Sequence, residues 1–184
     1  RSAKYALDQD QLTPYFELYV SPINFDPHAP ALPISTPADY AAELADAEGR
    51  FYTQGMPEDT RARNVEALTA DELLAQARIT ADENRRQFRY VLDHFRDGLL
   101  FYYFGHVDQV SHVMWRSMDP GHPAYTEADA QYRTVIADLY VEKDAVVGQA
   151  MAALGPNDLL VVMSDHGFAP WRRVQAKVNT GSAR

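Results

Sequence analysis

Two short apolar runs, at residues 99–104 and 159–163, constrain the fold of this chain more than any other feature. The first consists of Leu, Phe and Tyr between Gly98 and Gly105, and the second consists of Leu, Val and Met after a turn at 155–158. Each run is too short for a helix and has no polar face. Each therefore predicts an interior strand of a parallel sheet, buried on both sides.

The stretch between these runs predicts one helix from about residue 126 to residue 154. Its apolar residues recur at intervals of three and four, as at Val135, Leu139 and Val146. A strand, a long helix and a second strand without a hairpin turn form a βαβ crossover, which is parallel and right-handed. The predicted class is therefore α/β, a parallel sheet flanked by helices. The sheet is incomplete in this chain, because only two or three strands are visible.

The first half of the chain carries two helix starts. A Thr-Pro pair at 36–37 predicts the first residues of a helix that stops at Gly49. A Thr-x-x-Glu sequence at 69–72 predicts a capping box and a helix that runs to about residue 96.

The first forty residues contain one predicted strand and a proline-rich connection. Residues 15–20 are rich in aromatic residues, which predicts a strand, whereas residues 21–37 hold five prolines and predict an extended surface segment. We expect residues 21–68 to form a cap, an insertion or a surface connection. The chain begins with Arg1 rather than Met, so we expect it to be an internal piece of a longer protein.

The composition argues against several classes of function. The absence of cysteine excludes disulfides, thiolate metal sites and thiol nucleophiles. A net charge of −9 disfavours nucleic acid and anionic membranes as partners, and no apolar run approaches a membrane span. A small phosphorylated substrate stays compatible, because bound divalent cations would reverse the local charge. Oligomeric state and compartment are left open, and both cytoplasmic and extracytoplasmic locations are compatible.

An Asp and a His follow each of the two predicted strands. Asp108 and His112 come after the first strand, and Asp165 and His166 come after the second. The carboxyl ends of parallel strands meet at one edge of a sheet, so we expect all four side chains to gather there. Asp108 and His112 are four residues apart and share a helix face, while Gly167 permits a sharp turn beside the second pair. Oxygen and nitrogen ligands without sulfur suit zinc, manganese or iron.

Structural roles for the same residues stay open. Asp108 could cap a helix N-terminus, Asp165 could cap a turn, and His166 could be a histidine satisfied within the core. The alternatives for neighbouring residues are of the same kind. His106 could line the site, and the loop residue His122 could lie in a substrate pocket, although the absence of a functional role is favoured for His122.

Two further features near these motifs have competing interpretations. The aromatic residues Tyr102, Tyr103, Phe104 and Trp115 could stack on a base, but a role in the core is favoured. Arg172 and Arg173 could approach a substrate phosphate, but a solvated pair is favoured.

These motifs resemble the alkaline phosphatase superfamily, and within it the type I phosphodiesterase/nucleotide pyrophosphatase branch. The resemblance is carried by residues 101–123, which include the Asp-x-x-x-His spacing, by Met-Ser-Asp-His-Gly-Phe at 163–168, and by residues 49–60. It covers most of the chain from about residue 15 onward. It implies an alkaline-phosphatase-like fold in which residues 1–184 are part of a single catalytic domain.

The resemblance also implies a metal centre with two divalent ions, zinc or alternatively manganese. Asp108 and His112 would bind one ion, and Asp165 and His166 would bind the other. Such enzymes form a covalent phospho-enzyme on a Thr or Ser nucleophile. We expect this nucleophile outside the chain, because Ser111 is favoured as a local hydrogen-bonding residue.

The implied function is metal-dependent hydrolysis of phosphoric esters, of the phosphodiesterase or nucleotide pyrophosphatase type, by the parent protein. We expect the 184 residues alone to be inactive and to bind metal weakly. The alternatives are a phosphomonoesterase, sulfatase or phosphonate hydrolase of the same superfamily, and a non-catalytic binding domain that retains the fold.

Overall fold

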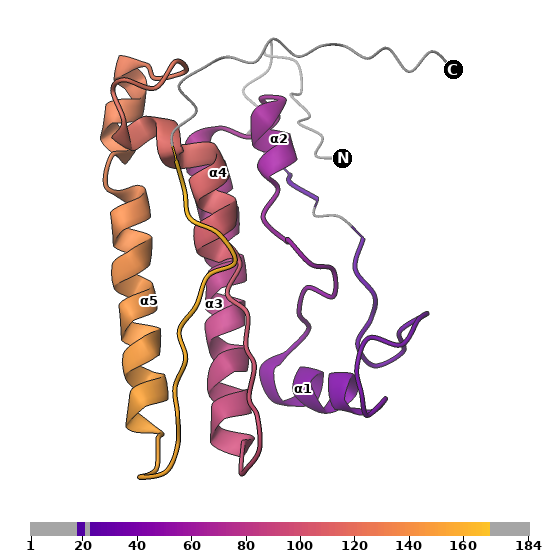
Figure 1. Cartoon of the computed structure of the whole chain (residues 1–184). Coiled ribbons are helices and arrows are strands. Elements are labelled where there is room, and N and C mark those ends of the chain that lie inside the picture. The colour runs from indigo at the N-terminus through magenta and orange to yellow at the C-terminus, as the bar shows by residue number, and fades with distance from the viewer. Residues whose placement is uncertain (1–17, 21–22, 170–184) are drawn as a thin grey trace, which may run out of the picture.

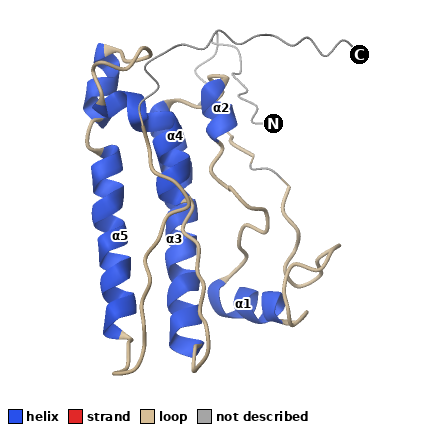
Figure 2. Cartoon of the chain, in the orientation of Figure 1, coloured by secondary structure: helices blue, strands red, loops and turns tan. Residues whose placement is uncertain are grey.

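A computed structural model describes residues 18–20 and 23–169, which form helices joined by long extended segments (Figure 1; Figure 2). The helices are α1 (Tyr40–Glu48), α2 (Thr60–Asn64), α3 (Ala70–His94), α4 (His106–Met118), the 3-10 helix η1 (Glu127–Tyr132) and α5 (Val135–Ala152). α4 contacts α2, α3, η1 and α5, and it therefore occupies the centre of the helical layer. No helix in the described part of the chain is long and apolar enough to cross a membrane.

The core lies where α3, α4 and α5 meet. Its buried members are small or flexible apolar side chains, which let the helices approach closely: Ala70, Ala77, Val110, Met114 and Leu139. Leu73 of α3 is fully buried as well. This packing fixes α4 in position along its length.

The predicted capping box at the start of α3 is confirmed. The Thr69 side chain accepts the backbone N–H of Glu72 at 3.2 Å, and the Glu72 carboxylate accepts the backbone N–H of Thr69 at 2.6 Å. These bonds satisfy two of the amide groups that a helix N-terminus leaves unpaired. α3 ends at His94, close to the predicted end.

α1 begins later than predicted. The helix starts at Tyr40 rather than at 36–37, because residues before it form a turn around Ser35. The Ser35 hydroxyl donates to the carbonyl of Pro37 at 2.8 Å and accepts the backbone N–H of Ala41 at 3.1 Å. The predicted stop at Gly49 is confirmed, and this residue has a φ of 86°, which favours glycine.

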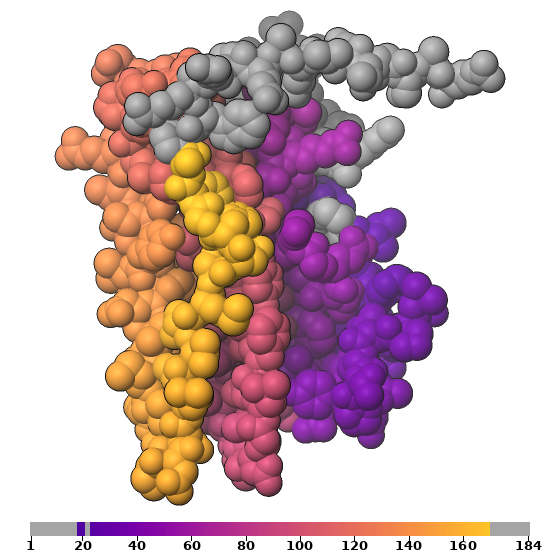
Figure 3. Space-filling model, viewed as in Figure 1, coloured from indigo at the N-terminus to yellow at the C-terminus, as the bar shows by residue number. Residues whose placement is uncertain are grey.

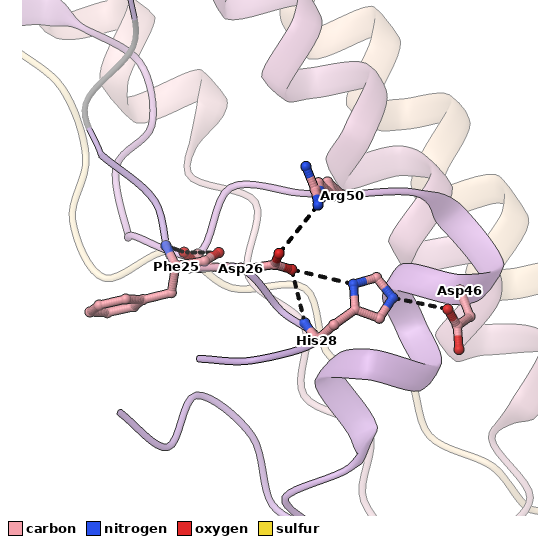
Figure 4. A network of polar contacts seen from close by, with 6 residues as sticks. Phe25, Asp26, His28, Asp46 and Arg50 are labelled. Atoms are coloured by element: carbon pink, nitrogen blue, oxygen red, sulfur yellow. Dashed lines mark hydrogen bonds and ion pairs between the residues drawn. The ribbon is translucent and has the colours of Figure 1, made fainter. Parts of the chain in front are cut away.

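The loop before α1 is tied to that helix by a polar network, shown in Figure 4. The two ring nitrogens of His28 lie 3.3 Å from Asp26 and 2.9 Å from Asp46. Arg50 lies 3.2 Å from the other oxygen of Asp26. The network thus connects the residues before α1, α1 itself and the residue that follows its C-cap.

The single helix predicted over 126–154 is wrong, because the structure divides it into η1 and α5. Thr126 and Asp129 form a separate capping box that opens η1. At the end of η1, the carbonyl of Tyr132 accepts the Ser117 hydroxyl at 3.2 Å, which draws it toward α4. The continuous apolar spacing did not reveal this break.

The two predicted strands are extended segments, without strand pairing in the part of the chain that the structure describes. Residues 98–105 and 155–169 run in the same direction beside the helices (Figure 1). Of the segment predicted at 15–20, only 18–20 is described, and these residues form no strand. The parallel sheet therefore stays a prediction.

The expected burial of these segments on both sides is not found among the described residues. Tyr102 and Phe104 pack against Phe88 of α3, with ring centroids 5.1 and 5.2 Å apart, so one face of the first segment is covered. Side chains on its other face are exposed, such as Leu99 at 91%. The second segment lies on the surface of the molecule (Figure 3), and Leu159 is 85% exposed.

Candidate metal centre

The predicted ligands converge beside the first turns of α4. Asp108 Oδ1 lies 3.3 Å from Nε2 of His112, one turn further along the helix. The same oxygen lies 3.5 Å from Nε2 of His166, which belongs to the extended segment 155–169. Asp165 lies at the rim, with an oxygen 3.9 Å from His166 Nε2 and a side chain that is 81% exposed. The structure therefore brings both predicted Asp/His pairs to one place.

The start of α4 is positioned by a glycine and by a buried polar contact. Gly105 precedes the helix, and a Cβ at this residue would lie 3.0 Å from the ring of Tyr103, so glycine permits the close approach. His106, the first residue of α4, is buried with its Nδ1 3.0 Å from Oε1 of Glu58. Thr80 of α3 also donates to this oxygen, at 2.9 Å. His106 is therefore an anchor for the helix and does not join the ligand cluster.

Two electron-rich atoms, Nε2 of His166 and Oδ1 of Asp108, face each other in the cluster. His166 Nδ1 lies 3.1 Å from the carbonyl of Gly167, which can only accept, so Nδ1 carries a proton. In the neutral ring, Nε2 therefore directs a lone pair toward Asp108. Asp108 Oδ1 is shielded from solvent and has no hydrogen-bond partner among the described residues. A cation between these atoms, either a metal ion or a ring proton, is needed to satisfy them.

The spacing of the cluster fits a metal ion. The coordinating atoms of Asp108, His112 and His166 all lie within 4.8 Å of one another. Nitrogen and oxygen ligands at about 2.0–2.1 Å in a tetrahedral arrangement lie about 3.3–3.4 Å from each other. The distances of 3.3 and 3.5 Å from Asp108 to the two histidines match that geometry. The donor set, which lacks sulfur, suits zinc or manganese.

Tyr103 is a polar residue near the cluster for which no role at the metal site was predicted. Burial, followed by the negative charges of Asp108 and Asp165, raises the pKa of the Tyr103 phenol. The phenol therefore stays protonated and can donate a hydrogen bond near the cluster. Its position in an apolar run favoured a role in the core, yet its side chain is 57% exposed.

A pocket of about 460 Å³ adjoins the cluster and shares His112 and His166 with it. The pocket is formed by the end of α2, by α4, by His122 and by residues 166–169. Trp115, for which the core was favoured, lies on the pocket wall and stacks on Phe168 with ring centroids 5.2 Å apart. His122 also lines the pocket, although the sequence favoured no functional role for it.

Neither of the two serines closest to the motifs is placed as a free nucleophile. Ser111 is 1% exposed, and the Ser164 hydroxyl donates to the carbonyl of His166 at 2.6 Å. Arg172 and Arg173 lie outside the described residues.

Comparison with known proteins gives one family match. The model of the family described as type I phosphodiesterase / nucleotide pyrophosphatase matches residues 23–181, a range that includes every predicted ligand. No curated protein and no solved structure matches the chain significantly.

Proposed function

Because the chain belongs to the type I phosphodiesterase/nucleotide pyrophosphatase family, hydrolases of the alkaline phosphatase superfamily, we propose that the protein hydrolyses phosphoric diesters with two divalent metal ions. The observation that carries this proposal is the convergence of Asp108, His112 and His166 around an unsatisfied carboxylate oxygen. Zinc is the first choice of metal and manganese the alternative, since both accept this donor set.

In this proposal Asp108 and His112 hold one ion, and Asp165 and His166 hold the second. The two ions of such centres lie about 3.5–4 Å apart. The 3.3 and 3.5 Å distances within Asp108, His112 and His166 fit a single ion, so the cluster supports the first ion, and the second is proposed from Asp165 and His166 at the rim of the same cluster. When bound, the ions supply positive charge to the phosphoryl oxygens and to the departing oxygen.

The chain's own residues then orient the ligands and the substrate. The Gly167 carbonyl holds the His166 ring in the tautomer that presents Nε2, and Glu58 anchors the start of α4 through His106. The pocket receives the organic part of the substrate. The Thr or Ser nucleophile is expected outside these 184 residues, because Ser111 is buried and the Ser164 hydroxyl is engaged.

The proposal is tested by assaying the whole protein that carries this chain with bis(p-nitrophenyl) phosphate, in Zn²⁺, in Mn²⁺ and in a chelator. We expect metal-dependent turnover that Asp108→Asn abolishes. The matched control is Asp144→Asn on α5, because Asp144 is exposed and belongs neither to the cluster nor to the pocket lining. The control should retain full turnover.

The competing functions give different outcomes in the same experiment. Faster hydrolysis of p-nitrophenyl phosphate, p-nitrophenyl sulfate or a phosphonate ester would favour a phosphomonoesterase, sulfatase or phosphonate hydrolase. Metal binding without turnover of any ester would indicate a non-catalytic domain. Turnover by the 184 residues alone would contradict the proposed external nucleophile and direct attention to Ser111.

A further inference from the structure

The pocket beside the cluster contains an arginine, Arg63, without an ion-pair partner among the described residues. Arg63 lines the pocket from the last turn of α2, and its Nε is shielded from solvent and has no hydrogen-bond partner in the part of the chain that the structure describes. No carboxylate of a described residue lies within ion-pair distance of its guanidinium. A shielded donor without an acceptor destabilises the folded chain, and a guanidinium offers a fork that matches a carboxylate or a phosphate. An anionic group of a ligand would therefore satisfy the Arg63 guanidinium.

The other arginine of the pocket is already paired. Arg116 lies 3.3 Å from Asp129, which is itself buried and accepts the hydroxyl and backbone N–H of Thr126 through its other oxygen. This contact fixes the position of the Arg116 guanidinium and compensates its charge. A ligand anion thus gains more from Arg63 than from Arg116.

Further donors and one acid complete the polar lining. The backbone N–H of Ala124 donates to Nδ1 of His122 at 3.1 Å, so the neutral His122 ring carries its proton on Nε2 and can donate. Glu66 is the one carboxylate among the residues that line the pocket, and it is exposed. Because Asp129 compensates the charge of Arg116, the remaining charged side chains among the described residues of the lining are Arg63 and the exposed Glu66.

The pocket also has an apolar wall. Trp115 and Phe168 stack with their planes 18° apart, and Phe168 packs edge-on against His112 at 4.9 Å between centroids. The wall therefore begins at the ligand cluster. Arg63 and this aromatic surface line the same pocket, so an ester group on a phosphorus at the cluster can contact both.

We propose that Arg63 makes this pocket selective for phosphodiesters whose second ester group carries its own negative charge, a carboxylate or a phosphate. This proposal rests on the proposed hydrolysis of phosphoric diesters. It adds a substrate class and a specificity residue, and it assigns Arg63 to the organic group of the substrate rather than to the reacting phosphoryl group.

The test measures kcat/KM of the whole protein for p-nitrophenyl phosphodiesters that differ in the second ester group. The groups are 3-carboxyphenyl, 3-phosphonophenyl, neutral phenyl and cationic choline. One charge-assisted hydrogen-bonding contact predicts a preference of about 10- to 100-fold for the anionic groups over phenyl. The anionic ester with the larger kcat/KM relative to the phenyl ester, the carboxylate or the phosphonate, identifies the anion that the pocket prefers.

Variants assign this preference to one residue. Arg63→Gln should remove the preference by lowering kcat/KM for the anionic esters much more than for the phenyl ester, whereas Arg63→Lys should retain part of the preference because charge is kept without the fork. Arg61→Gln is the matched control, because Arg61 lies on α2, is exposed and does not line the pocket. Equal preferences in the wild type and in Arg63→Gln would overturn the proposal.

A binding measurement separates this proposal from the proposed hydrolysis. Calorimetry compares 3-carboxyphenylphosphonate with phenylphosphonate, neither of which is hydrolysed. A loss of affinity for the first compound alone in Arg63→Gln supports the specificity role, even if no diester is turned over and the hydrolase proposal fails. An equal loss for both compounds would overturn it, because Arg63 would then bind the phosphonate itself.

Discussion

Replacement of Glu58 with alanine is expected to destabilise the fold by about 3 kcal/mol. Oε1 of Glu58 lies 3.0 Å from Nδ1 of His106 and 2.9 Å from the Thr80 hydroxyl, and all three side chains are buried. Removal of one partner of a buried pair costs about 3–5 kcal/mol. We expect the lower end, because the Thr80 hydroxyl has the Ala77 carbonyl as a second acceptor at 2.8 Å.

The pH dependence of this loss gives an independent check. Burial raises the pKa of the Glu58 carboxyl, but the hydrogen bonds from His106, the backbone and Thr80 outweigh burial and leave the pKa below its ordinary value. The carboxylate of Glu58 therefore stabilises the fold fully above about pH 4.5, and this contribution is lost as the pH falls through the lowered pKa. The difference between the wild type and Glu58→Ala should shrink in acid.

Urea unfolding followed by circular dichroism measures both effects. Glu58→Gln keeps an acceptor of the same shape and should cost only about 1 kcal/mol, the difference between a charge-assisted and a neutral hydrogen bond. Glu127→Ala is the control, because Glu127 is exposed, and its effect should stay within about 0.5 kcal/mol. A loss under about 1 kcal/mol for Glu58→Ala, or a loss that persists in acid, would refute the anchoring role of this pair.

Three further predictions concern the fold. Leu73→Ala should cost about 3–5 kcal/mol in urea unfolding, because Leu73 is fully buried, whereas Leu32→Ala at an exposed position should have little effect. Thr69→Ala should cost about 1 kcal/mol in the same assay, and an unchanged midpoint would show that the capping box contributes nothing. Hydrogen bonds to Asp46 and then to Asp26 raise the pKa of His28, so the network in Figure 4 stabilises the fold fully below about pH 6.5 and weakens as the pH rises through the raised pKa. An NMR titration of His28 should show a raised midpoint that Asp46→Asn lowers, and an ordinary midpoint in the wild type would contradict this account.

Local signals were sufficient for several parts of the structure. The capping box at 69–72 and Gly49 act through neighbouring backbone groups, so the sequence identified both helix boundaries. The spacing of Asp108 and His112 placed them on one helix face for the same reason. Their approach to His166 was predicted from a tertiary argument, that the carboxyl ends of two parallel strands meet at one edge of a sheet; the side chains do approach, whereas the sheet itself stays a prediction.

Other features depend on contacts that the sequence does not encode locally. The break between η1 and α5 involves Ser117 of another helix, and the start of α1 depends on the Ser35 turn. Arg63 lies in a helix of five residues without a motif, and only the assembled pocket distinguishes it from other arginines. Trp115 looked like a core residue because periodicity cannot separate a buried face from a pocket wall.

The central claim is that a divalent metal ion, and not a proton on a histidine ring, satisfies the Asp108 carboxylate in the cluster of Asp108, His112 and His166. Thermal melts of the protein at pH 7.5, with increasing Zn²⁺ or Mn²⁺ and then with a chelator, test it directly. Binding to the folded state alone stabilises by about 2.7 kcal/mol at a concentration 100 times the Kd. We expect a melting temperature that rises with metal, falls again with chelator, and loses this response in Asp108→Asn and His166→Gln. The claim would be contradicted if metal left the melting temperature of the wild type unchanged, or if metal raised the melting temperature of both variants as much as that of the wild type.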